Sequence, residues 1–71
     1  MRAVCKCWFE ARGFGFLTTD DKKDYFVHRF SLRNVQSLIP GDVVEFDEVT
    51  VERNGRPDTR AINAWVLEPV T

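Results

Sequence analysis

The sequence predicts an all-β fold in which five short antiparallel strands close into a small barrel. Segments rich in β-branched and aromatic residues alternate with turn signals along the chain, and no stretch has a clear helical period. With 71 residues, the chain is expected to form one domain over residues 1–71. Closing so short a sheet into a barrel buries one of its faces and removes its open edges.

The first half of the chain predicts three strands. They are expected at residues 4–9, 14–19 and 25–28. The turn 10–13 ends the first strand, and the polar turn 20–23 separates the second from the third. Residues 30–40 have no clean period, so a loop with about one helical turn is expected there.

The second half predicts two further strands joined by a hairpin. The turn 40–42 contains a proline and a glycine and precedes the fourth strand, which spans residues 43–51. The pair Asn54-Gly55 is a strong hairpin signal between two β-type segments. The fifth strand is expected over residues 60–67.

A change of side-chain parity inside the fourth strand predicts a bulge. Val44 and Phe46 lie on one face, whereas Val49 and Val51 have the opposite parity. A bulge near residues 47–48 would reconcile the two sets, and strongly coiled barrel strands need such bulges. Together these elements predict a five-stranded antiparallel barrel of the OB type.

Composition and charge exclude several classes of protein. Hydrophobic residues make up 44% of the chain and charged residues 30%, which is typical of a soluble globular domain. No apolar run approaches the roughly 20 residues of a membrane span, and the N-terminus lacks the apolar core of a signal peptide. We therefore expect a cytoplasmic protein without a membrane partner. The net charge of −1 argues against binding of nucleic acid by bulk charge alone.

Few residues are suited to metal binding or catalysis. Cys5 and Cys7 are separated by one residue and are expected to be reduced thiols in a strand. A metal site needs about four ligands, and His28 is the single histidine with no third cysteine available, which argues against such a site. No recognisable nucleophile or phosphate-binding loop is present. We expect no enzyme activity, no metal and no cofactor.

The second and third strands carry an unusual set of aromatic side chains. Their period of two separates Phe14, Phe16, Phe26 and His28 on one face from Leu17 and Val27 on the other. If the aliphatic pair enters the core, the rings form an exposed face. Alternation alone does not say which face is buried, so a core made of the rings stays open as an alternative.

An exposed row of rings suggests a ligand with flat apolar faces. Nucleobases fit this description, since each base stacked on an aromatic side chain contributes about 1–3 kcal/mol. Gly13 and Gly15 are expected to remove side chains between the rings and admit a ligand backbone. Lys6, Arg12 and Arg29 flank the rings in sequence and are placed to meet phosphates.

These segments resemble the cold-shock domain family over nearly the whole chain. Residues 12–17, Arg-Gly-Phe-Gly-Phe-Leu, resemble its first ribonucleoprotein motif, and residues 25–28, Tyr-Phe-Val-His, resemble its second. Residues 38–46 and 61–63 are similar to its fourth-strand entry and final strand. The resemblance implies an OB barrel that binds single-stranded RNA or DNA with low sequence specificity and acts as an RNA chaperone. It also implies that Phe14, Phe16, Phe26 and His28 stack bases and that Arg12 supplies the preceding positive charge.

The first strand departs from the family pattern of Lys-Trp-Phe-Asn followed by three residues. One alignment shortens the turn and makes Trp8 the stacking tryptophan. A gapless alignment instead gives Cys7 the stacking place, Trp8 and Cys5 core places, and Lys6 its usual surface place. Strand parity favours the gapless alignment, although Trp8 and Phe9 could border the site in either one.

A second departure follows His28, where Arg29 replaces the family's frequent phenylalanine and Phe30 comes one residue later. Arg29 is suited to stacking or phosphate contact and Phe30 to stacking. The next loop is short and has no aromatic residue, which predicts a smaller footprint than usual. The complete predicted interface comprises Lys6, Trp8, Arg12, Phe14, Phe16, Phe26, His28, Arg29 and Phe30.

Other functions remain open at this point. The aromatic face could instead contact a protein partner, making the chain a protein–protein interaction module on an OB barrel, and the acidic fourth strand would suit such a role. A translation-factor-like OB barrel also fits the length and residues 41–44, but the paired motifs favour nucleic-acid binding. We expect a monomer, with a homodimer as the alternative.

Overall fold

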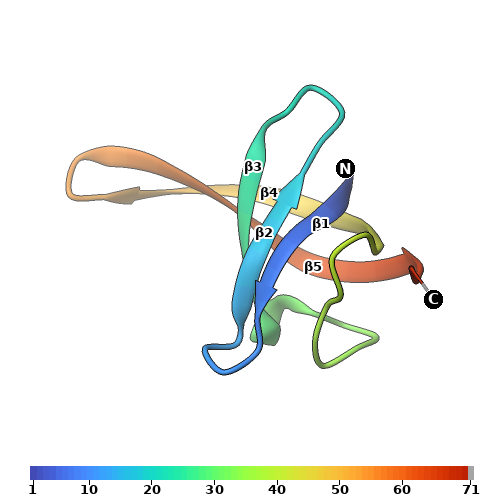
Figure 1. Cartoon of the computed structure of the whole chain (residues 1–71). Helices are drawn as coiled ribbons and strands as arrows, with labels where there is room; N and C mark the ends of the chain where they lie inside the picture. The colour runs from blue at the N-terminus through green and yellow to red at the C-terminus, as the bar shows by residue number, and fades with distance from the viewer. Residues whose placement is uncertain (71) are drawn as a thin grey trace.

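A computed structural model describes residues 1–70 of the chain, apart from the side chain of Arg53. It contains five strands in one sheet and a short 3-10 turn (Figure 1). The strands are β1 (Arg2–Phe9), β2 (Phe14–Thr18), β3 (Asp24–His28), β4 (Val43–Arg53) and β5 (Arg56–Glu68), and the turn is η1 (Arg29–Ser31). The predicted all-β class and the number of strands are confirmed. Among these residues no helix is long and apolar enough to cross a membrane.

The strands pair in a ring, in the order β1-β2-β3-β5-β4, and β4 returns to β1 to close the barrel. Four of the pairings are antiparallel, but β3 and β5 run parallel where Phe26 lies opposite Arg60. The prediction of a wholly antiparallel barrel was therefore wrong. Strand direction can alternate all the way round a closed ring only when the number of strands is even, so five strands require at least one parallel pair.

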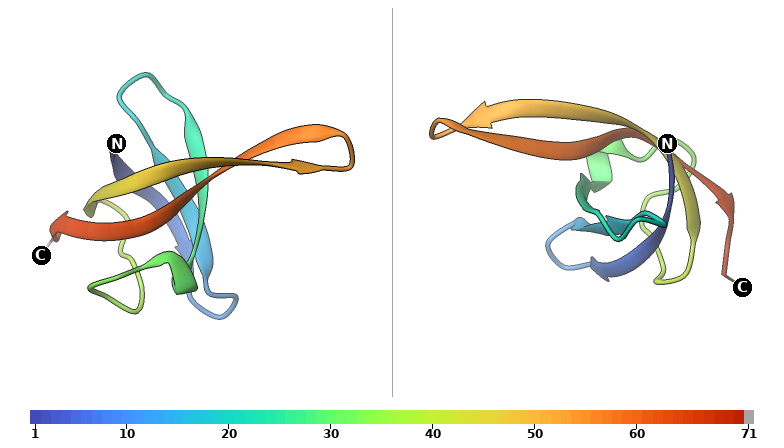
Figure 2. Two further views of the ribbon diagram at one scale, coloured as in Figure 1. Left: turned by 180° about the vertical axis from the view of Figure 1, so that it is seen from behind. Right: turned by 90° about the horizontal axis from the view of Figure 1, so that it is seen from above.

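The hairpin of β4 and β5 is longer than predicted and projects from the barrel as a two-stranded arm (Figures 1 and 2). Pairing continues to Arg53 and Arg56, which flank a two-residue turn. Asn54 and Gly55 both have positive φ, 54° and 76°, as the tight hairpin signal predicts. We call residues 50–59 the arm.

Irregularities in strand register set which side chains face the core. Opposite the predicted bulge, the register of β4 with β5 shifts between Glu45 and Asp47, but the extra residue belongs to β5, because the partners step from Trp65 to Ile62. A further shift between Val43 and Val44 also has its extra residue in β5. In β1 the register shifts between Cys5 and Cys7, so Lys6 is the extra residue. This bulge in β1 reverses the parity of the end of the strand, which decides which of its side chains lie beside the rings of β2.

The core is made of aliphatic and aromatic side chains from every strand. Its buried members are Ala3, Cys5, Leu17, Tyr25, Val27, Leu32, Leu38, Val44, Phe46, Ala61 and Ala64. Leu17 and Val27 have no exposed surface, which confirms the predicted inner face of β2 and β3.

Alkaline pH is expected to destabilise this core through Tyr25 and Cys5. Tyr25 Oη donates a 2.6 Å hydrogen bond to Glu48 Oε2, and that bond is the main reason that the pKa of Tyr25 is raised to about 12. Burial is the main reason that the pKa of Cys5 is raised to about 11. The ordinary values are 10.0 and 9.0, so the folded state holds both protons more tightly. The associated stability is fully present below about pH 9 and lost between about pH 9 and 12.

Urea unfolding of the wild type, Tyr25→Phe and Cys5→Val between pH 8 and 12 would check this expectation. Tyr25→Phe should lose less stability than the wild type above pH 10, and Cys5→Val should lose less above pH 9. The same pH dependence in all three proteins would contradict the assignment.

Candidate nucleic-acid interface

The outer surface of β2 and β3 carries a cluster of partly exposed rings. Phe14 lies opposite His28 and Phe16 opposite Phe26 in the register of the two strands. The rings of Phe14 and Phe26 are 5.4 Å apart and nearly parallel, at 29°. The ring of Phe16 meets both of them edge-on, with centres 6.3 and 6.0 Å away. The structure thus brings the four predicted stacking residues together on one face.

Phe9 belongs to the same surface. It lies opposite Phe14 at the end of β1, its ring centre is 5.2 Å from that of Phe14, and it is 46% exposed. Sequence reasoning left Phe9 uncertain because it did not foresee the bulge at Lys6. We define the aromatic face as Phe9, Phe14, Phe16, Phe26 and His28.

Trp8, by contrast, lies apart from the aromatic face. It pairs with Gly15 and packs against the core, and its Nε1 donates a 2.6 Å hydrogen bond to Glu10 Oε2. Cys7 lies opposite Phe16, on the side of the rings. This arrangement matches the gapless alignment, in which Cys7 takes the stacking place and Trp8 a core place.

Gly15 faces the barrel interior and does not separate the rings, so its expected role in admitting a ligand was wrong. It has the parity of Leu17, and both residues are buried. A Cβ atom there would lie 2.7 Å from Trp8 Cε3 and closer still to the Cys7 carbonyl oxygen. Gly15 therefore allows β1 and Trp8 to pack closely against β2. Gly13 has a φ of 72° and shapes the turn that precedes the rings.

His28 continues the aromatic face toward η1. Its Nδ1 accepts a 3.2 Å hydrogen bond from the Phe30 backbone N–H, so the neutral imidazole carries its proton on Nε2. The rings of His28 and Phe30 are 4.8 Å apart, and Phe30 is 79% exposed. Phe30 therefore extends the row of exposed rings beyond His28.

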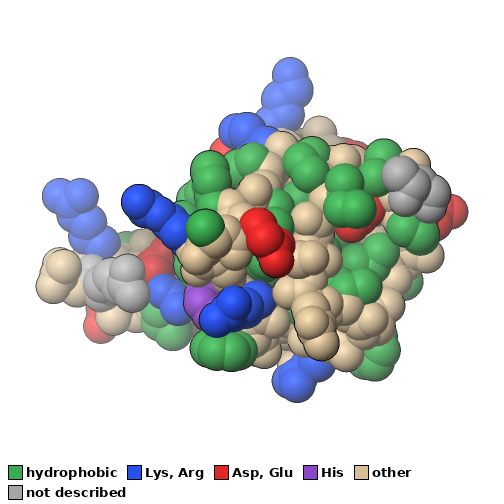
Figure 3. Space-filling view, turned by 60° about the horizontal axis from the view of Figure 1, so that its bottom comes forward, with side chains coloured by type: hydrophobic (Ala, Val, Ile, Leu, Met, Phe, Trp, Pro, Cys, Tyr) green, Lys and Arg blue, Asp and Glu red, His purple; other side chains and the backbone are tan. Residues whose placement is uncertain are grey.

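Two arginines contact the rings, Arg29 at Phe30 and Arg60 at Phe26, and Figure 3 shows Lys and Arg side chains next to the histidine. Lys6 is held by Asp24 in an exposed ion pair of 3.1 Å. Arg12 is exposed in the turn between β1 and β2, and Arg29 Cζ lies 5.4 Å from the centre of the Phe30 ring. Arg60, which sequence reasoning missed, places its Cζ 5.5 Å from the centre of the Phe26 ring.

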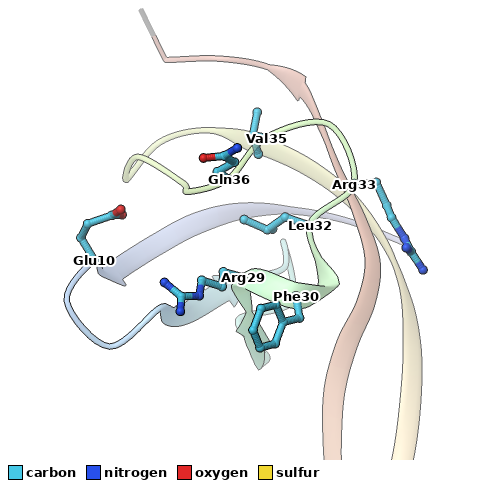
Figure 4. A pocket seen from close by; sticks show the side chains of 7 residues that line it. All are labelled: Glu10, Arg29, Phe30, Leu32, Arg33, Val35 and Gln36. Carbon is cyan, nitrogen blue, oxygen red and sulfur yellow. The ribbon is translucent and has the colours of Figure 1, made fainter.

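A hollow of about 560 Å³ extends the surface beyond Phe30 (Figure 4). Its lining residues are Glu10, Arg29, Phe30, Leu32, Arg33, Val35 and Gln36. Arg33 is anchored at its rim, because its Nε donates a 3.0 Å hydrogen bond to Asn63 Oδ1 of β5. The hollow offers space next to an exposed ring but no second aromatic platform.

Comparison with known proteins identifies a family. Residues 1–66 match the family model of the 'Cold-shock' DNA-binding domain. The chain is 34% identical to a cold shock-like protein of Thermotoga maritima over 71 residues, covering 96% of this chain and all of that protein. It is 38% identical to the cold shock-like protein CspC of Buchnera aphidicola over 64 residues, covering 84% and 87% of the two chains.

A plant protein gives a partial match. The glycine-rich protein 2 of Nicotiana sylvestris is 42% identical over 60 residues, which cover 79% of this chain but 27% of the plant protein. The similarity therefore extends to one segment of that longer protein. With its five-stranded barrel, its paired aromatic strands and a family match over residues 1–66, the chain belongs to the cold-shock domain family, a family of nucleic-acid-binding proteins.

Proposed function

We propose that this protein binds single-stranded RNA or DNA with low sequence specificity and acts as a nucleic-acid chaperone. The observation that carries the proposal is the aromatic face: partly exposed rings lie directly above Leu17 and Val27, which are fully buried. Membership of a nucleic-acid-binding family supports the same ligand class.

Stacking would supply most of the affinity. Each base that covers a ring contributes about 1–3 kcal/mol whatever its identity, because every base has a π-face. Single strands expose these faces, whereas a duplex hides them between neighbouring base pairs. The aromatic face therefore favours single strands over duplexes.

Charge would add a smaller contribution. The net charge is −1, and two of the candidate cations, Lys6 and Arg60, already have carboxylate partners in Asp24 and Asp58. With three or four phosphate contacts, the logarithm of the binding constant should fall with the logarithm of salt concentration at a slope of about −2 to −3.

Chaperone activity would follow from mass action without ATP. A protein that binds the open strand and not the hairpin shifts the equilibrium toward the open form by an amount that grows with its free concentration. Weak hairpins would open first, because their folding free energies are small.

The decisive test is fluorescence anisotropy with labelled oligothymidine, oligouridine and a duplex of equal length. Both single strands should bind at least about tenfold more tightly than the duplex, with the salt slope given above. Equal binding of the duplex, or no binding of either single strand, would contradict the proposal.

The short loop after η1 also predicts an occluded site of fewer than about seven nucleotides, which titration of long oligothymidine would measure.

A further inference from the structure

A second kind of surface lies where the aromatic face meets the arm. A pocket of about 380 Å³ is lined by Phe16, Phe26, His28, Asp58 and Arg60. The three rings come from β2 and β3, whereas the two charged side chains come from the start of β5. The pocket thus combines aromatic rings that suit the face of a base with a polar wall that suits its edge.

We propose that this pocket selects guanine at one position of a bound single strand. Arg60 would read the base, and Asp58 would act as a positioning residue that fixes the guanidinium. The inference rests on the proposed function, because the pocket borders the same aromatic face. It adds base selectivity to a surface that otherwise stacks any base.

The geometry of Arg60 supports this role. Its Nη2 donates a 2.9 Å hydrogen bond to Asp58 Oδ2, and the two side chains are 30% and 35% exposed. The partly sheltered pair holds the guanidinium over the ring of Phe26, with Cζ 5.5 Å from the ring centre. Arg60 Nε is buried and has no hydrogen-bond partner among the described residues. Because Nε is buried, the donors that remain for a base are N–H groups of the two Nη atoms.

The chemistry of the base edge favours guanine. Guanine presents two adjacent acceptors, O6 and N7, and the planar fork of arginine donates to both at once. Adenine replaces O6 by the N6 amino group, which would point a donor at the guanidinium. Cytosine presents its N4 amino group, and thymine or uracil presents a single carbonyl, O4, on the corresponding edge.

The test compares wild-type binding of oligothymidine with binding of the same strand carrying one guanine, moved through each position in turn. The best position should bind about tenfold more tightly than thymine. Replacing that guanine by 7-deazaguanine removes N7 and should abolish most of the gain, whereas inosine keeps O6 and N7 and should retain it. A gain that survives in the 7-deaza strand would overturn the proposal.

Substitutions in the pocket test whether its residues cause the increase in affinity that guanine brings. Arg60→Gln and Arg60→Lys should both lose the guanine preference, because neither side chain can donate two parallel hydrogen bonds to O6 and N7. Binding of oligothymidine should change much less in both variants. Asp58→Asn should reduce the preference. Arg56→Gln removes an equal charge from the exposed arm and should leave the preference unchanged.

The two proposals can fail separately. If oligothymidine does not bind at all, the proposed function is wrong. If oligothymidine binds but guanine brings no gain at any position, the proposed function stands and the guanine pocket does not.

Discussion

Replacing Phe26 by alanine is expected to weaken single-strand binding by about tenfold to a hundredfold, and Phe14→Ala should have a similar effect. The physical reason is the loss of one stacking platform, which contributes about 1–3 kcal/mol. Because stacking does not depend on base identity, oligothymidine, oligouridine and mixed strands should all lose affinity by similar factors. Anisotropy titrations with the three strands would measure these losses.

The double variant is informative because the two rings touch. Their centres are 5.4 Å apart, so removing one ring also removes support from the other. Residues in contact commonly fail to add. We therefore expect the double variant to lose less binding free energy than the sum of the two single losses, yet more than either alone.

A matched control is available in Trp65, which is 50% exposed and lies on β5 opposite Glu45 of β4. Trp65→Ala removes a large aromatic surface away from the aromatic face and should leave affinity almost unchanged. Thermal melts of all variants separate lost binding from lost folding. A loss of affinity in Trp65→Ala as large as that in Phe26→Ala would argue against a localised stacking surface.

The aromatic face could be predicted from sequence because it depends on local alternation. Within β2 and β3, one parity is aromatic and the other includes Leu17 and Val27, and no bulge interrupts the register between the two strands. Once the aliphatic set is assigned to the core, every ring is placed. Such a pattern needs no knowledge of distant residues.

The end of β1 could not be predicted in the same way. The bulge at Lys6 reverses the parity of the residues that follow, so uninterrupted alternation from Cys5 would put Trp8 outside and Phe9 inside, the opposite of what the structure shows. A bulge arises from how two strands coil round the barrel, and it leaves little local signal. One signal was available: uninterrupted alternation puts Cys5 and Cys7 on one face, whereas the gapless alignment buries Cys5 and exposes Cys7, which requires a bulge between them.

Arg60 and Asp58 were missed for a different reason. They lie far from the aromatic motifs in sequence and reach them through the parallel contact of β3 with β5. The strand that carries them also begins earlier than expected, because Pro57 and Asp58 are poor strand formers whereas the hairpin turn continues the pairing through them. Long-range closure of the barrel, and not local preference, creates the polar wall.

Gly15→Ala is expected to destabilise the fold by about 3 kcal/mol and to lower the melting temperature by roughly 10–25 °C. The added methyl group would meet the Cys7 carbonyl oxygen and Trp8 Cε3, and the carbonyl belongs to the backbone of a paired strand. Neither neighbour can move without separating β1 from β2. Thermal and urea unfolding would measure the loss.

Gly55→Asn provides the control. A Cβ atom at Gly55 meets nothing within 4 Å, and asparagine tolerates the positive φ of 76° better than most residues. This variant should melt close to the wild type, so the comparison isolates the clash at Gly15 from the general effect of replacing a glycine.

The Gly15→Ala variant also distinguishes two possible roles for Gly15. If this glycine served to admit a ligand between the rings, alanine would weaken binding and leave the melting temperature unchanged. Its inward position requires the opposite: a large loss of stability, with nearly normal affinity for single strands at low temperature, where the folded form still dominates. Because β1 and β2 pair tightly only when position 15 has no side chain, the aromatic face depends on a residue whose Cβ position points away from it, toward Trp8 and β1.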